Sequence, residues 1–434
     1  MLTIYELAAV LLSLSAIFGW VNRRFLRLPH TIGLLLMGLG SSSFLLLTQA
    51  LFPGLELTTS LQRAIAQIDF YDTIMNGMLA FLLFAGALHV DFAKLRDQGW
   101  AIGLLATVGV VISTVVIGAV LWLVSGLVGF PVPLAWALVF GALISPVDPV
   151  AVLSLLRTVK VPESLKAKIA GEALFNDGVA VVAFSVLVAA AVSAGAGSES
   201  LSPVHIGEML LVEGVGGVVF GLLAGWLAQR AMAAIDDHVV EILVSVAVCA
   251  ATYAISLRLH ISGPIAVVVA GLMVGNHGST IVMSEQVKRY MYAFWEVVDE
   301  ILNSVLFLLI GLEVLVLVFA PAYAWLVLIS IPVVLLGRLI SVAAPITLLS
   351  LRQTFSRSVI PVMTWGGLRG GVSVALALAL PDSPYKPVLL AATYAVVIFS
   401  IVVQGLSVKW VVARTLPAAP PPGDLELKSP TPTP

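Results

Sequence analysis

The sequence has few charged residues and a single cysteine. Only 11% of its 434 residues are Asp, Glu, Lys or Arg, against about 25% in an average soluble protein. The lone Cys249 lies in an apolar run, which excludes a disulfide framework and a cysteine metal site. The net charge is −2, so there is no excess of basic residues, which argues against a nucleic-acid partner. The sequence also lacks HExxH, nucleophile-elbow and phosphate-loop motifs, which disfavours an enzyme.

The sequence is instead rich in long apolar runs. Hydrophobic residues make up 60% of the chain and the mean hydropathy is +1.09, so we predict an all-α membrane protein. About thirteen segments reach the roughly 20 residues that a spanning helix needs. The first is followed by Asn22-Arg23-Arg24, which fits a retained span better than a signal peptide. The expected spans are 2–21, 31–51, 71–90, 100–128, 133–156, 164–195, 206–229, 239–257, 261–276, 291–319, 321–350, 356–381 and 387–413.

The basic residues predict the topology. Nearly all lysines and arginines outside the spans lie in loops that follow odd-numbered spans. The positive-inside rule then places the N-terminus outside and the C-terminus in the cytoplasm. We expect one transmembrane domain over residues 1–416 and a disordered cytoplasmic tail over the Pro-rich residues 417–434. Residues 277–290 look like a link or an interfacial helix.

Two of the predicted spans are interrupted. In span 5, Pro146 and Pro149 flank Asp148, and each proline removes a backbone donor. Span 12 contains WGGLRGG at 365–371, with Arg369 among four glycines. A broken helix at membrane depth is tolerated where protein or water satisfies its backbone, as at transporter binding sites. The two spans are seven apart and therefore have opposite topology, which indicates an inverted repeat that matches spans 4–6 with spans 11–13.

These interruptions predict two half-helix pairs that cross at the midplane. Asp148 is expected to neutralise positive helix N-termini and Arg369 negative C-termini. The alternative is that the glycines form an ordinary close helix contact and that Arg369 snorkels to the interface. An arginine in the middle of a span favours the functional interpretation.

Span 6 carries three polar residues at membrane depth. Glu172 and Asn176 are four residues apart and share a helix face, whereas Asp177 points about 100° away. Arg338, in span 11, is the natural partner for one carboxylate, and we pair it with Glu172. Asp177 then lacks a fixed counter-charge, as an ion-binding carboxylate should. Because helix facing alone does not decide the pairing, a pair of Asp177 with Arg338 stays open as the alternative.

A hard monovalent cation needs oxygen ligands at this place. The Asp177 carboxylate is the expected Na+ ligand, and unwound carbonyls such as that of Ser145, with water, are further candidates. Burial favours the protonated carboxylate, so a proton and a cation compete for one site. Such competition is sufficient for antiport when the site opens alternately to each side. Na+ and H+ are then transported substrates, and no cofactor is expected.

Other polar residues are weaker candidates. Glu313 ends an apolar run as either a pore-side or an interfacial acid. Glu296, Asp299 and Glu300 cluster near the entrance of a span, where a solvated acidic face is a simpler interpretation than a cation funnel. The histidines all lie at loop edges, where an ordinary interfacial role is the simpler interpretation.

Four motifs together carry a resemblance to a known family. VDPVAV (147–152), GEALFNDGVAVV (171–182), FLLIGLE (307–313) and GGLRGGVSVALAL (366–378) resemble the NhaP-type sodium/proton antiporters, which belong to the cation/proton antiporter family with the animal sodium/proton exchangers. The resemblance covers about residues 70 to 410. It implies electroneutral exchange of Na+ for H+ at Asp177.

The resemblance also implies roles for the other residues. Asn176 and Asp148 would brace the crossing, and Glu172 and Arg338 would form a structural ion pair. A homodimer with core and dimerisation domains, an elevator-like six-helix bundle and a place in the bacterial inner membrane also follow from it. A K+/H+ antiporter is the alternative of the same class. A passive cation channel is disfavoured because no selectivity-filter loop is found.

The sequence departs from the family pattern at two places. Ala173 stands where many members have a serine that helps to ligate the ion, and span 3 lacks an acid that many members carry near Ala85–Ala87. These departures reduce the number of side-chain oxygens that the site can offer.

Overall fold

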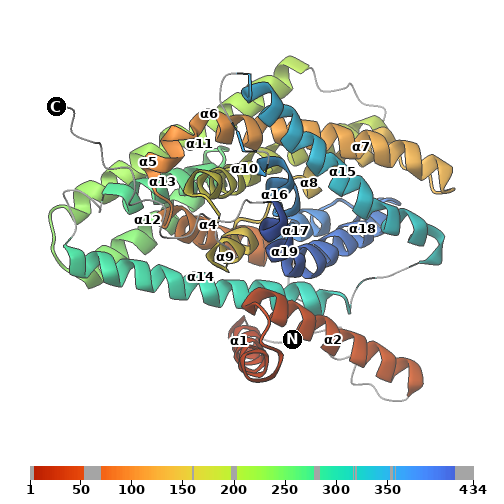
Figure 1. Cartoon of the computed structure of the whole chain (residues 1–434), viewed down its shortest axis with the longest axis horizontal. Helices are drawn as coiled ribbons and strands as arrows, with labels where there is room; N and C mark the ends of the chain where they lie inside the picture. Colours follow the sequence, from red (N-terminus) through yellow and green to blue (C-terminus); the bar gives the residue numbers. More distant parts are fainter. Residues whose placement is uncertain are drawn as a thin grey trace, which may run out of the picture.

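A computed structural model describes residues 4–52, 70–158, 161–196, 203–277, 284–315, 317, 320–351, 355–356 and 358–415, and within this part the regular structure is entirely helical (Figure 1). The longer helices are α1 (Ile4–Val21), α2 (His30–Leu51), α4 (Leu79–Leu88), α7 (Val110–Leu127), α8 (Leu134–Ile144), α9 (Pro149–Thr158), α10 (Glu163–Ala196), α11 (Pro203–Met232), α12 (His238–Arg258), α13 (Gly263–His277), α14 (Glu285–Glu313), α15 (Ala324–Leu349), α18 (Lys386–Phe399) and α19 (Gly405–Thr415). The shorter helices and π or 3₁₀ turns are η1 (Asn22–Leu26), η2 (Asp72–Met78), α5 (Phe92–Asp97), α6 (Gly99–Leu104), η3 (Leu105–Gly109), η4 (Pro321–Tyr323), α16 (Val359–Trp365), α17 (Gly371–Leu378) and η5 (Ser400–Gln404).

The structure is helical within the predicted spans, so the all-α membrane fold is confirmed, whereas the count of thirteen spans stays a prediction. In the described part of the chain, nine helical runs are long and apolar enough to cross a membrane, and two shorter apolar helices end at Leu88 and Asn276. Residues 277–290 were expected to form a link or an interfacial helix, and α14 begins within this range at Glu285. The Ser284 hydroxyl accepts a hydrogen bond from the amide of Val287 at 3.4 Å, and residues 278–283 lie outside the described part. The inverted repeat stays a prediction. The predicted tail, 417–434, lies outside the described residues.

The helices form two groups that pack mainly within themselves. The scaffold group comprises α1, α2, α4 and α11–α14, and the crossing group comprises α6–α10 and α15–α19. In Figure 1, α14 runs along one side of the molecule with α1 and α2 against its outer face. The interrupted spans lie together in the crossing group, where the labels of α8, α16 and α17 gather.

At the boundary between the two groups, two glycines face aliphatic side chains. Gly178 of α10 lies against Ile265 of α13, where a Cβ would overlap the isoleucine. A Cβ at Gly371 of α17 would come within 2.6 Å of the Leu306 side chain of α14. Such contacts let helices approach closely without forming a hydrogen bond across the boundary.

Within the scaffold group, α2 and α14 approach through a pair of glycines. A Cβ at Gly38 would lie 3.1 Å from the Cα of Gly311, and the reverse distance is 2.9 Å. The hydroxyl of Ser42 donates to the carbonyl of Gly311 at 2.9 Å. Because neither Gly38 nor Gly311 has a side chain, the two helix backbones pack directly against each other at this point.

Gly38→Leu is expected to force α2 away from α14 and to lower stability by about 1–3 kcal/mol, the usual cost of overpacking. Gly40→Leu is the matched control, because it lies on the same helix and no atom lies within 4 Å of a Cβ there. Thermal unfolding in detergent should show a lower melting temperature for the Gly38 variant alone. Equal melting temperatures would contradict the close contact.

Candidate functional site

The two interrupted spans meet at their interruptions. The chain is unwound between α8 and α9, at residues 145–148, and between α16 and α17, at residues 366–370. The amide of Asp148 donates to the carbonyl of Leu368 at 2.8 Å, which ties one unwound segment to the other. Four half-helices therefore end around one buried point, and their free backbone groups need partners there.

Asp148 lies at the N-terminal ends of two of these half-helices. Its Oδ1 accepts from the amides of Val150 at 2.9 Å and Ala151 at 3.2 Å, so it caps α9. Its Oδ2 lies against Gly370, the residue before α17, where a Cβ would overlap it. Helix N-termini favour a negative charge at this place.

Arg369 lies at the C-terminal end of α8. Its guanidinium donates to the carbonyl of Ser145 and to that of Pro146, the latter at 2.8 Å. Its own amide donates to the hydroxyl of Ser400 at 3.0 Å. The side chain is 2% exposed, so it does not snorkel to the interface, and its charge lies at the negative end of a helix.

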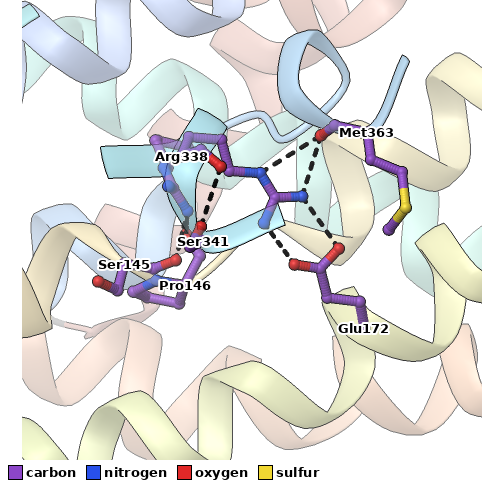
Figure 2. A network of polar contacts seen from close by, with 7 residues as sticks. Ser145, Pro146, Glu172, Arg338, Ser341 and Met363 are labelled. Atoms are coloured by element: carbon purple, nitrogen blue, oxygen red, sulfur yellow. Dashed lines mark hydrogen bonds and ion pairs between the residues drawn. The ribbon is translucent and has the colours of Figure 1, made fainter. Parts of the chain in front are cut away.

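Arg338 makes two connections at once (Figure 2). Its Nη1 and Nη2 donate to the two carboxylate oxygens of Glu172, with an Nη2–Oε2 distance of 2.9 Å. Its Nε and Nη2 also donate to the carbonyl of Met363, at 3.3 and 3.0 Å. Met363 lies in the last turn of α16, so Arg338 satisfies the C-terminal end of that half-helix. The structure thus pairs Arg338 with Glu172 and not with Asp177.

The Met363 contact was not predicted from the sequence. The break in span 12 shows that C-terminal carbonyls are freed there, but nothing local indicates which arginine reaches them. The contacts of the charged side chains also explain why glycines occupy residues 365–371. A Cβ at Gly367 would overlap the Nε of Arg338, just as one at Gly370 would overlap Asp148. These glycines make room for the charged side chains of the crossing.

Asp177 is the acid at the crossing that has no hydrogen-bond partner. It is 0% exposed in α10, and neither carboxylate oxygen has a partner among the described residues. Asp148 and Arg369 interact with it electrostatically, which places it beside the crossing. The Oδ1 of Asn176 and the Oδ2 of Asp148 are likewise buried without a partner in this part of the chain. The site therefore offers several buried oxygens that no protein donor uses.

Ser145 and the two alanine positions contribute less. The Ser145 carbonyl accepts from Arg369, and its hydroxyl donates to the carbonyl of Gly141 at 2.6 Å. Ala173 and Ala85 are both buried and provide no side-chain oxygen. The Ser145 carbonyl, which was expected to bind the ion, therefore accepts a hydrogen bond from Arg369 in this conformation.

A cavity of about 320 Å³ lies between the scaffold group and the crossing group. Its wall includes Val150, two residues beyond Asp148, and Asp299 and Asn303 of α14. Lys94 and Glu163 also line it and form an ion pair at 2.8 Å. Asp299 and Glu300, whose simpler interpretation was a solvated face, thus border a cavity that approaches the crossing from one side.

The contacts of Arg338 predict unequal losses of stability. Arg338→Ala leaves Glu172 buried without its partner and the end of α16 uncapped, whereas Glu172→Ala leaves Arg338 bound to Met363. Breaking a buried pair costs about 3–5 kcal/mol. We expect a lower melting temperature for Arg338→Ala than for Glu172→Ala. The double variant should lose less stability than the sum of the two single losses. Strictly additive losses would show that the two side chains do not act together.

Comparison with known proteins places these residues in a family. The profile described as "Sodium/hydrogen exchanger, transmembrane" matches residues 11–414. The Na(+)/H(+) antiporter NhaP of Pseudomonas aeruginosa is 43% identical over 423 residues, which is 96% of this chain and 98% of that protein. The Na(+)/H(+) antiporter NhaH of Halobacillus aidingensis is 35% identical over 399 residues, 90% of this chain and 93% of that protein.

The fold has a counterpart among solved structures. The sodium proton antiporter MjNhaP1 of Methanocaldococcus jannaschii, solved at pH 8, matches with a TM-score of 0.69 at 18% identity, covering 94% of this chain and 97% of that one. An electron-microscopy structure of the same antiporter gives a TM-score of 0.73 at 17% identity, with coverage of 97% and 100%. The chain belongs to the sodium/hydrogen exchanger family.

Proposed function

We propose that this protein exchanges Na+ for H+ without net charge movement, by alternating access at Asp177. As a member of an exchanger family it is a secondary transporter and not an enzyme, and the transported ions are its substrates. The observation that carries the proposal is the isolation of Asp177, which is buried and whose two carboxylate oxygens have no hydrogen-bond partner among the described residues, beside an otherwise neutralised crossing. The relatives named above are called sodium/proton antiporters, so the potassium alternative has no support in them.

The proposed ligands are oxygens around Asp177. Its carboxylate binds either Na+ or a proton, and Asn176 and Asp148 are the candidate ligands beside it. Asn176 Oδ1 has no donor among the described residues, and the Asp148 carboxylate also interacts with the backbone amide of Gly371. Ser145 acts through its carbonyl, which orients Arg369. Because Ala173 and Ala85 add no oxygen, water completes the coordination of the ion, as hard cations require.

The charges at the crossing support a single titrating group. Glu172 is held by Arg338, Asp148 caps α9, and Arg369 donates to the end of α8. Of the acids placed at the crossing, Asp177 remains free to exchange its ion. A site that holds either one Na+ or one H+ moves no net charge in a full cycle.

The two helix groups suit an elevator-like movement. In this proposal the transmembrane domain comprises residues 1–416, the crossing group is the transport bundle and the scaffold group forms a homodimer interface. The glycine and aliphatic contacts at the boundary, such as Gly178 with Ile265, offer no hydrogen bond that would resist a shift. The cavity beside Val150 is then the access route from one face.

The membrane orientation follows from the positive-inside rule, with the N-terminus outside and the C-terminus in the cytoplasm. We place the protein in the inner membrane of a bacterium, in keeping with the bacterial sources of NhaP and NhaH. In this orientation the acids Asp299 and Glu300 face the cytoplasmic cavity. Na+ would enter from that side and leave outside, driven by inward movement of H+.

Asp177→Asn is expected to abolish exchange, because the amide cannot alternate between a proton and Na+. The protein should remain folded, since the Asp177 carboxylate makes no hydrogen bond to any described residue. Sodium-induced dequenching of a pH dye in inverted vesicles measures the activity, and melting temperature checks the fold. A variant that dissipates the proton gradient on sodium addition as the parent does would place the ion site elsewhere.

Exchange is expected to respond to the pH gradient and not to membrane voltage. If one net charge crossed per cycle, a potential of about 100 mV would contribute about 2.3 kcal/mol to each turnover. In proteoliposomes clamped with potassium and valinomycin, the initial rate of sodium/proton exchange should therefore stay the same. As a control, potassium is added in place of sodium and must drive no proton exchange. A rate that rose severalfold with voltage would mean that a second carboxylate titrates.

A further inference from the structure

Two side chains of span 13, which comprises α18, η5 and α19, hold the two ends of the break in span 12. α16 ends at Trp365, and the chain is unwound until α17 begins at Gly371. The side-chain amide of Gln404 donates to the carbonyl of Trp365 at 3.2 Å, where the break begins. The backbone amide of Arg369, near the end of the break, donates to the hydroxyl of Ser400 at 3.0 Å. Ser400 and Gln404 are both buried, so bulk water reaches neither contact.

These two residues are the first and the last of a π-helical turn. η5 separates the α-helices α18 and α19 within one continuous helical run. A π-helical turn is wound with i→i+5 hydrogen bonds, so its residues are placed differently from those of the α-helix on either side. The turn of span 13 that departs from α-helical winding is thus the turn that contacts the break in span 12.

The break carries backbone contacts on which the crossing depends. Leu368, inside it, accepts from the amide of Asp148 at 2.8 Å. The guanidinium of Arg369 donates to the carbonyl of Ser145 in the other unwound segment. A shift of the break therefore moves both Asp148 and the Ser145 carbonyl, and it changes the geometry of the proposed ion site.

Gln404 lies beside both arginines of the crossing. A small cavity of about 10 Å³ has Arg338, Arg369 and Gln404 in its wall. Arg338 donates to the carbonyl of Met363, two residues before the carbonyl of Trp365 to which Gln404 donates. A charged donor from span 11 and a neutral donor from span 13 therefore satisfy neighbouring carbonyls at the end of α16, where lipid offers no partner.

We propose that Ser400 and Gln404 are positioning residues for sodium binding. They hold the break in the shape that places Asp148 and Arg369 at the crossing, so they act through those residues and not by contact with the ion. A ligand set that is ordered before the ion arrives binds it more tightly than one that the ion must order. Loss of either contact should therefore weaken sodium binding selectively. The inference rests on the proposed antiport.

The test separates the half-saturating sodium concentration from the saturated rate of exchange, both measured in proteoliposomes. Ser400→Ala removes the acceptor for the Arg369 amide, and Gln404→Met removes the donor to Trp365 at nearly constant size. Each should raise the half-saturating sodium concentration by about fivefold, the effect of one lost hydrogen bond. Ser400→Thr keeps the hydroxyl and should retain the parental value.

Ser407→Ala is the matched control. The hydroxyl of Ser407 accepts from the indole of Trp365 at 2.9 Å, so this contact joins the same two spans but leaves the backbone of the break free. The variant should keep the parental half-saturating concentration. A merely structural role of Ser400 and Gln404 would lower the melting temperature and the saturated rate without raising that concentration.

Parental half-saturating concentrations in both Ser400→Ala and Gln404→Met overturn the proposal. An equal rise in Ser407→Ala does so too, as does a Ser400→Thr protein that binds sodium as weakly as Ser400→Ala. If Ser400→Ala does not reach the membrane, Gln404→Met decides by the same titration. Failure of antiport itself would look different, because the parent would then show no sodium-driven exchange.

Discussion

The four half-helix ends at the crossing impose the constraint on which the rest of the structure depends. Backbone groups freed inside a membrane domain must find partners, since lipid offers none. Three charged side chains occupy these ends. Asp148 accepts from the N-terminal amides of α9 and faces the start of α17, while Arg369 and Arg338 donate to C-terminal carbonyls of α8 and α16. Each side chain has the sign that its helix end favours. The interrupted helices are stable because the charges and the breaks compensate one another.

This compensation also isolates Asp177, the acid that we propose binds the transported ion. The guanidinium of Arg338 donates both to the carbonyl of Met363 at the end of α16 and to the carboxylate of Glu172 in α10. One side chain therefore caps a half-helix and pairs with a buried acid. Asp177, five residues beyond Glu172, is left with buried oxygens and no donor among the described residues. An ion pair at Asp177 would have competed with any transported ion. In the proposed mechanism, the structural charges therefore leave the Asp177 carboxylate available to a transported ion.

The two alanines limit which atoms can meet that ion. Ala173 and Ala85 are buried and have no side-chain oxygens, so in the proposed mechanism selectivity depends on the carboxylate of Asp177, the amide of Asn176 and water. The apolar boundary between the helix groups has a related consequence. The contact of Leu306 with Gly371 is apolar, whereas Asp299 of the same helix lines the cavity and Glu313 ends the helix.

The sequence by itself determined the class of protein, the positions of the spans and the two interruptions, because apolar length and Pro or Gly breaks act locally along the chain. It also supplied the short set of charges at membrane depth. It left open whether residues 277–290 form a link or an interfacial helix, since hydropathy does not follow a charged helix beyond the apolar core, and the structure begins α14 at Glu285. Only the tertiary structure decided that Arg338 meets both Glu172 and Met363, and that Gly367 and Gly370 make room for Arg338 and Asp148. Those contacts join segments up to hundreds of residues apart, and they depend on how each helix is rotated against its neighbours, which helical spacing alone does not fix.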